Sequence, residues 1–185
     1  MCIPVYLYVC LMAIIECIHT YMHAHIYMQF VLLSMIAGAM YAIRSQVNLN
    51  KGSRLFKNTA ESSGGAIYLN GGQVVLADIY VSNNSAIAGA AVSSSGARIS
   101  VNKCSFDRNL VVGGYGGAFR LYGLDSVVDI VQSTLSFNSA TRGTGCTIES
   151  TGCGGGGAII VTGNTRLTLS GNKNQTHHFR SGKCT

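Results

Sequence analysis

Acidic side chains are the first candidates for chemistry in this chain. Polysaccharide lyases and hydrolases place two or more carboxylates together, as general acid and base or as Ca²⁺ ligands. The chain repeats a pattern every 25 to 29 residues, and stacking of the repeats would bring equivalent residues together. Serine occupies the position equivalent to Asp107 and to Asp129 in the preceding repeat, and Asp78 and Asp125 also lack acidic equivalents. The sequence therefore predicts no catalytic residue and no cofactor.

Cysteine and histidine are the other residues that could react or bind a metal. Cys146 and Cys153 lie close together in an insertion, residues 141–155, that interrupts the repeat. Two thiols in one loop suggest a disulfide if the protein is secreted, and a C-x6-C pair with no nearby His is a weak zinc site. Three histidines near the N-terminus lack an acidic or Cys partner to complete a site: His19, His23 and His25. The sequence predicts no metal site.

The repeat itself has two steps in a fixed order. An apolar residue lies three positions before an Asn, and a Gly-Gly-Ala or Gly-Ala-Ala step follows. Recurrence at a fixed period indicates a repeat architecture. The apolar residues are Leu55, Val81, Phe106 and Leu135, and the Asn residues are Asn58, Asn84, Asn109 and Asn138. The Gly-Gly-Ala steps are Gly64, Gly65 and Ala66, then Gly116, Gly117 and Ala118, then Gly156, Gly157 and Ala158.

The elements that carry these steps alternate apolar and polar residues, as half-buried strands do. Arg120 should face solvent, which directs Phe119 and Leu121 inward. Three short strands and three corners in about 25 residues form one rung of a parallel β-helix, and residues 44–172 hold about four to five rungs. We expect the Asn residues to stack as a ladder of hydrogen bonds. The Gly-Gly-Ala steps should form corners that pass close to the neighbouring rung.

The segment before the repeats, residues 1–43, is apolar and contains one charged residue, Glu16. Its two apolar stretches, 3–18 and 28–43, are shorter than the ~20 residues that a spanning helix prefers. We weigh a membrane anchor or hairpin, a mis-assigned start, and a secretory signal that begins at Met28 and ends at small residues 37–39. We expect export, with membrane association through this segment if it is not cleaved. Residues 173–185 form a polar tail.

Charge argues against a nucleic-acid partner. Charged residues make up 11% of the chain and the net charge is +6, from 13 Lys and Arg that are spread singly along the sequence. Nucleic-acid binding requires a basic stripe combined with groove-reading or stacking elements. The low charge also disfavours surface helices, and with the repeats it favours an all-β protein.

The two repeat steps resemble those of a known family. FDRN (106–109), together with GGAI at 64–67 and at 156–159, is similar to the signatures of the chlamydial polymorphic outer membrane protein repeat. The resemblance covers roughly 55–172. It implies a right-handed parallel β-helix of pectin-lyase-like shape, displayed at cell surfaces and often adhesive.

The expected function follows from the scaffold and the resemblance. We predict a non-catalytic protein, secreted or held at the cell surface or outer membrane, that adheres to a glycan or protein of a host or neighbouring cell. The alternative is a fragment of a β-helical polysaccharide lyase or hydrolase whose catalytic rungs lie elsewhere. If there is a recognition surface, the insertion at 141–155 is the first candidate, with Arg142 and Glu149 as its charged residues, because loops on rigid scaffolds commonly carry function.

Overall fold

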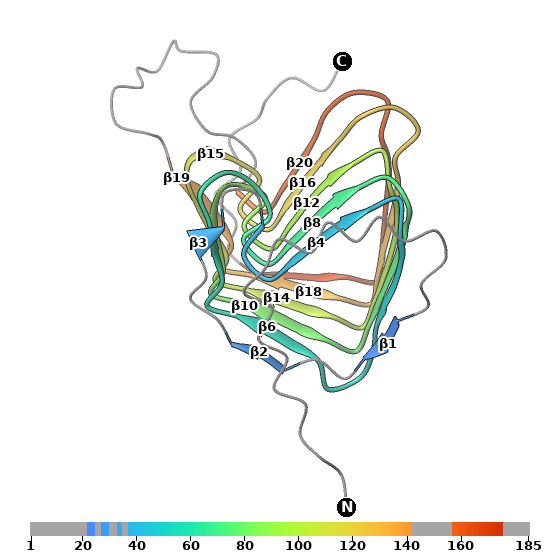
Figure 1. Cartoon of the computed structure of the whole chain (residues 1–185), viewed down its shortest axis with the longest axis horizontal. Helices are drawn as coiled ribbons and strands as arrows, with labels where there is room; N and C mark the ends of the chain where they lie inside the picture. The colour runs from blue at the N-terminus through green and yellow to red at the C-terminus, as the bar shows by residue number, and fades with distance from the viewer. Residues whose placement is uncertain (1–21, 25–26, 30–32, 35–36, 142–156, 176–185) are drawn as a thin grey trace, which may run out of the picture.

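The computed structural model describes residues 22–24, 27–29, 33–34, 37–141 and 157–175. All regular secondary structure in these residues is β-strand, and every strand pair is parallel. The strands form four sheets, and the chain visits one strand of each sheet in turn before it returns to the first sheet one rung later (Figure 1). The predicted all-β parallel β-helix is confirmed, with about four complete rungs.

Sheets A and B contain six strands each. In spatial order, sheet A consists of β1 (Met22–Ala24), β5 (Gln46–Leu49), β9 (Gln73–Ala77), β13 (Arg98–Asn102), β17 (Val127–Val131) and β21 (Arg166–Ser170). Sheet B consists of β2 (Tyr27–Gln29), β6 (Arg54–Phe56), β10 (Tyr80–Ser82), β14 (Ser105–Asp107), β18 (Thr134–Ser136) and β22 (Lys173–Gln175).

Sheets C and D contain five strands each. Sheet C consists of β3 (Leu33–Ser34), β7 (Thr59–Ala60), β11 (Ser85–Ala88), β15 (Leu110–Tyr115) and β19 (Ser139–Thr141). Sheet D consists of β4 (Met40–Ile43), β8 (Ile67–Asn70), β12 (Val92–Ser95), β16 (Phe119–Tyr122) and β20 (Ile159–Val161).

Each rung has four strands, so the prediction of three was wrong. The strand of each rung that the sequence pattern did not reveal is the one in sheet C. Its inward positions carry small residues, such as Ala86 and Ala88, and its outward positions include the exposed Ile87. This reverses the usual contrast between large inward and polar outward side chains, which is the signal that marks a half-buried strand.

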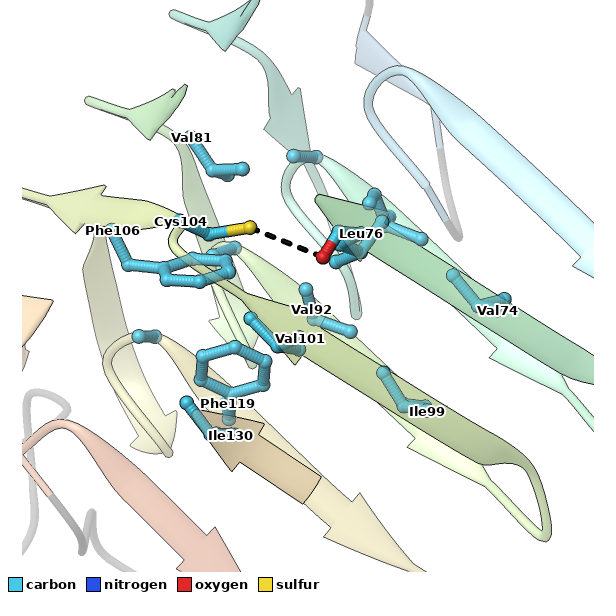
Figure 2. Close-up of a cluster of buried hydrophobic side chains, with 14 of the residues drawn as sticks. Val74, Leu76, Val81, Val92, Ile99, Val101, Cys104, Phe106, Phe119 and Ile130 are labelled. Carbon is cyan, nitrogen blue, oxygen red and sulfur yellow. Dashed lines mark hydrogen bonds between the residues drawn. The ribbon is translucent and has the colours of Figure 1, made fainter. Parts of the chain in front are cut away.

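The register of the other sheets follows the repeat. Val81 is aligned with Leu55 on one side and Phe106 on the other, and Leu135 continues the row. Phe119 and Leu121 are fully buried, and Arg120 between them faces outward, as their alternation predicted. Large side chains from successive rungs therefore meet inside the solenoid (Figure 2).

Aromatic and aliphatic side chains fill the core. The rings of Phe106 and Phe119 pack edge to face with centroids 4.6 Å apart. The thiol of Cys104 lies in this core and donates a hydrogen bond to the carbonyl oxygen of Leu76, 3.3 Å away (Figure 2). Burial raises the pKa of this thiol, because the charged thiolate would lose its hydration. Cys104 is thus a core residue.

The first described rungs extend into the range predicted as the apolar N-terminal segment. Met40 is aligned with Ile67, and the backbone N–H of Ala39 donates to the carbonyl of Ala66 at 3.1 Å. Residues 37–40 therefore occupy the position that the Gly-Gly-Ala-Ile step holds in the next rung. This corner role accounts for the small residues that we considered as a cleavage site. Export and anchoring remain predictions, and no described helix is long and apolar enough to span a membrane.

Tight corners join the four sheets, and many use left-handed backbone. The residue before each ladder Asn has a φ of 50° to 55°, although none is glycine: Lys57, Asn83, Arg108 and Phe137. Such a conformation costs a residue with a Cβ roughly 1–2 kcal/mol. Between sheets C and D the same conformation falls on glycine, at Gly64, Gly89 and Gly116. The stacked rungs impose these corners regardless of local preference.

Two glycines with similar backbones test how much crowding matters at the corners. A Cβ on Gly89 (φ 54°) would collide with the carbonyl of Val92, whereas a Cβ on Gly96 (φ 62°) would meet only the carbonyl oxygen of Leu124, at 3.6 Å. Both Gly→Ala changes carry the left-handed cost, and overpacking adds roughly 1–3 kcal/mol at Gly89 alone. Urea unfolding should therefore show that Gly89→Ala is the less stable variant. Equal losses would contradict the account.

Ser94 lies inside the core, where its hydroxyl has no hydrogen-bond partner. It is aligned between the inward residues Leu69 and Leu121. Removing an unsatisfied buried hydroxyl avoids its desolvation cost, so Ser94→Ala should raise the free energy of unfolding by about 1 kcal/mol.

Ser126 is the matched control for Ser94. It is also buried, but its hydroxyl donates to the carbonyl of Tyr122 and accepts from the N–H of Gly96, both at 2.9 Å. Ser126→Ala should therefore lower the free energy of unfolding, and thermal unfolding of both variants measures the two changes. A loss of stability in both variants would refute the interpretation of Ser94.

Candidate binding surfaces

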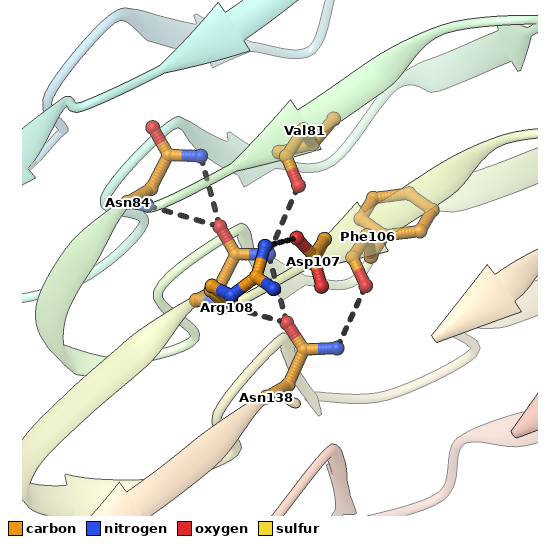
Figure 3. Close-up of polar contacts among 7 residues, drawn as sticks. Val81, Asn84, Phe106, Asp107, Arg108 and Asn138 are labelled. Carbon is orange, nitrogen blue, oxygen red and sulfur yellow. Dashed lines mark hydrogen bonds and ion pairs between the residues drawn. The ribbon is translucent and has the colours of Figure 1, made fainter. Parts of the chain in front are cut away.

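The four Asn residues stack at the corner between sheets B and C and are almost fully buried. The side-chain oxygen of Asn109 accepts hydrogen bonds from the backbone N–H and the side-chain amide of Asn84, at 3.1 and 2.9 Å. Asn138 receives the same two bonds from Asn109, at 3.0 and 2.8 Å (Figure 3). Asn84 receives the same two bonds from Asn58. The ladder therefore runs through four rungs.

The side-chain amides of Asn84, Asn109 and Asn138 also bond the sheet B strand of the preceding rung. The side-chain amide of Asn109 donates to the carbonyl of Val81 at 3.0 Å, and that of Asn138 donates to the carbonyl of Phe106 at 2.9 Å. These bonds satisfy buried polar groups at a corner where no strand neighbour is available. With their polar atoms engaged inside the solenoid, these residues are not accessible to a ligand. The ladder fixes how successive rungs stack, and so it positions the residues on the outer faces of the sheets.

The Gly-Gly-Ala steps lie at the corner between sheets C and D, and Gly156 falls outside the described residues. A Cβ on Gly65 or on Gly117 would collide with a carbonyl oxygen of the next rung, that of Ala90 or of Gly157. The alanines of these steps are buried: Ala66, Ala118 and Ala158. The glycines thus permit close stacking. Cys146, Cys153, Arg142 and Glu149 also lie outside the described residues, so their predicted roles remain predictions.

The carboxylates do not converge in the described part of the chain. Asp129 is aligned with Ser100 and Thr168, and Asp107 is aligned with Ser82 and Ser136. The only ion pair among the described residues joins Asp107 to its neighbour Arg108 at 2.6 Å (Figure 3). That pair is exposed to solvent, where such contacts contribute little. The same residues contain no cluster of three metal-ligating side chains.

The outer face of sheet B is hollowed between its second and third strands. The hollow has a volume of about 350 Å³ and is lined by Arg54 and Phe56 of β6 and Tyr80 and Ser82 of β10. The guanidinium of Arg54 lies over the Tyr80 ring, 5.6 Å from its centroid. Tyr80 is 55% exposed, and no described carboxylate pairs with Arg54. The hollow therefore offers a cation, an aromatic ring and a hydroxyl.

The outer face of sheet D carries a second aromatic cluster. The rings of Tyr41 and Tyr68 stack with centroids 5.2 Å apart, and the hydroxyls of Tyr68 and Tyr122 lie 3.0 Å apart. Arg120 lies over the Tyr122 ring, 4.3 Å from its centroid. These side chains cover Ser93, which is fully buried on this face.

The Tyr68 hydroxyl stays protonated under ordinary conditions. Burial raises its pKa above the usual value, and the hydrogen bond to Tyr122 raises that pKa further. Arg120, Tyr68 and Tyr122 are only half-buried on sheet D, whereas Arg54 and Tyr80 are exposed and line a hollow on sheet B. Sheet B is therefore the better candidate for binding.

Neither aromatic cluster emerged from the sequence. The repeat identified inward residues, but an outward residue matters only through its neighbours one rung away, which are 25 to 29 residues distant in sequence. Tyr80 and Arg54, for example, meet because both occupy the first position of their sheet B strands. Reading the outward positions across aligned repeats could have found this pair.

Comparison with known proteins returned no match: no family model, no curated protein and no solved structure is similar to this chain. The fold and the outer surfaces therefore rest on the chain's own geometry.

The ladder gives a direct stability prediction. Asn109→Ala removes two donated and two accepted hydrogen bonds, and it takes the Asn109 acceptor away from the buried backbone N–H of Asn84. Because each unsatisfied buried group costs about 1–3 kcal/mol, the free energy of unfolding should fall by roughly 3 kcal/mol or more. Asn102→Ala, an exposed change in the same rung, should stay within about 0.5 kcal/mol of the unmodified chain. Similar small losses in both variants would argue against the ladder.

Proposed function

We propose that this chain is a non-catalytic binding protein, secreted or displayed at a cell surface, that attaches to a glycan or protein of a host or neighbouring cell. The observation that carries the proposal is the hollow on sheet B. Arg and Tyr are among the side chains enriched at binding hot spots, because they combine large contact area with hydrogen bonding. Here they lie together on a rigid sheet, exposed to solvent.

The chemistry of the hollow suits a ligand that has both an apolar face and hydrogen-bond acceptors. The Tyr80 ring can stack on such a face, and the Arg54 guanidinium has donors available for oxygen acceptors. Sugars and protein side chains both meet this description. Resemblance of the FDRN and GGAI steps to the chlamydial polymorphic outer membrane protein repeat supports surface display and adhesion.

The scaffold supports binding rather than chemistry. Hydrolysis or elimination of a polysaccharide requires carboxylates close together, and the described aspartates are aligned with serine or threonine instead.

A glycan array and a cell-binding assay test the proposal. The full chain should bind a subset of glycans or cells, and Arg54→Ala and Tyr80→Ala should each weaken binding about tenfold or more, because hot-spot truncations cost about 2 kcal/mol. Arg98→Ala removes another exposed cation, from sheet A, and should leave binding unchanged. Treating the cells with glycosidase or with protease separates a glycan partner from a protein partner.

Three outcomes would overturn the proposal. The chain could fail to bind any glycan or cell surface, or the Arg98 variant could lose as much affinity as the Arg54 variant. Release of unsaturated or reducing sugar products by the purified chain would show that the protein is an enzyme.

A further inference from the structure

The charged side chains of the described residues are distributed unevenly around the solenoid. Six of the ten described Lys and Arg residues, but only two of the five described Asp and Glu residues, lie on sheet B or at the corners on its two sides. This side therefore has a net charge of +4, from six cations and two acids, and the other sides together have +1, from four cations and three acids. We call it the basic face. Its cations, all of them exposed, are Lys51, Arg54, Lys57, Lys103, Arg108 and Lys173.

The stacking of the rungs gathers cations that are far apart in the sequence. Lys57 and Arg108 occupy the same position of the corner between sheets B and C, because the residues before them, Phe56 and Asp107, are both aligned with Ser82. At about 4.8 Å per rung, the two backbones lie about 10 Å apart along the solenoid. Sheet B forms one side of the solenoid (Figure 1), so the charges extend along this side instead of meeting at one point.

The two acids of the basic face compensate little of its charge. Asp107 pairs with Arg108, and this is the only ion pair among the described residues. Asp78 and Lys103 are neighbours at the corner between sheets A and B, where each follows one of two aligned residues, but they form no ion pair. The other cations of the face likewise have no described carboxylate within ion-pair distance. They are therefore available to anions from outside the chain.

The ligand that fits this face is long, negatively charged and contains rings. Lys57 borders the hollow on sheet B, because its backbone N–H donates to the carbonyl of Ser82 at 3.2 Å. The exposed ring of Tyr80 thus lies in a hollow with Arg54 in its lining and Lys57 beside it. A sugar ring can stack on the tyrosine while its sulfate or carboxylate groups accept hydrogen bonds from the cations. DNA suits the face less well, because no described residue forms a helix that could enter a groove.

We propose that the basic face binds a linear anionic glycan, which lies along the solenoid and places its sulfate or carboxylate groups on these cations. The inference rests on the proposed binding function and names the class of ligand. A sugar of the polymer occupies the hollow, and cations of neighbouring rungs hold the polymer on either side of it. Because the cations are exposed, salt screens their attraction for the glycan.

Four polymers test the ligand class on the unmodified full chain. Dextran, dextran sulfate and carboxymethyl dextran share one backbone and differ in charged group, and duplex DNA is a polyanion without sugars that could stack on the tyrosine. At least one of the two anionic dextrans should bind about tenfold or more tightly than neutral dextran, and the one that binds better identifies the anionic group. Raising the salt from about 50 to about 200 mM should weaken this binding about tenfold or more, because each neutralised charge releases counterions.

Two double variants test the position of the site. Lys57→Gln combined with Lys103→Gln removes two charges from the basic face and should weaken binding of the anionic dextran about tenfold. Glutamine suits these left-handed corners, because Gln132 has a φ of 48° at the position equivalent to Lys103 in the next rung. Arg98→Gln combined with Arg166→Gln removes two exposed charges from sheet A and should change the affinity less than about twofold. Circular dichroism should show that both variants are folded.

The outcomes separate this inference from the proposed function. Neutral dextran that binds as tightly as the anionic dextrans, equal losses in the two double variants, or tighter binding of duplex DNA would each overturn the anionic glycan. Binding to cells through Arg54 and Tyr80 that neither anionic dextran inhibits would also overturn it, and would leave the proposed binding function standing. A chain that binds neither the dextrans nor any glycan or cell surface would overturn both.

Discussion

The structure depends on stacking equivalent backbone segments directly over one another. Parallel strands satisfy their hydrogen bonds with the rungs on either side, but corners have no strand neighbour and must find other partners. The Asn ladder solves this at the corner between sheets B and C, where the side chains of Asn84 and Asn109 each bond the next Asn and the carbonyl of a neighbouring strand. The side-chain amides hold the rungs in register and also provide hydrogen-bond partners for the buried polar groups of the corner.

Because equivalent residues of successive rungs stack, the strand positions form rows along the solenoid. Inward rows have a structural role, and outward rows make up the surface. Inward rows hold apolar residues such as Phe106 and Phe119 and leave no room for a ligand. Outward rows are free to vary, and there the rung spacing brings together residues from different repeats, as it does for Arg54 and Tyr80. Recognition on such a protein is therefore set by neighbouring rungs together, and no single repeat contains the site.

Much of the fold was predictable because its constraints are periodic. The row of Leu55, Val81, Phe106 and Leu135 follows from one spacing, and so does the burial of Phe119 beside the outward Arg120. Sheet C was not predictable from alternation, because small residues line its inner side. The small residues at 37–39 resembled a processing signal, and only their alignment with 64–66 gives them a role in a corner.

The outer surfaces were less predictable for a physical reason. Their side chains are constrained by contacts across rungs, which a local pattern does not reveal. The left-handed backbone of Lys57, Arg108 and Phe137 was also not predictable from the sequence, because the stack imposes this conformation on residues that do not favour it.

A double-mutant cycle between Asn84 and Asn109 tests the central claim, that side-chain bonds at the corner couple one rung to the next. The two side chains share one hydrogen bond, from the Asn84 amide to the Asn109 side-chain oxygen, so alanine at both positions should cost less than the sum of the single losses, by about 1 kcal/mol. The asparagine side chains would then be shown to stabilise the stack together. Losses that add within about 0.3 kcal/mol would show that the two rungs are held independently and would contradict this account.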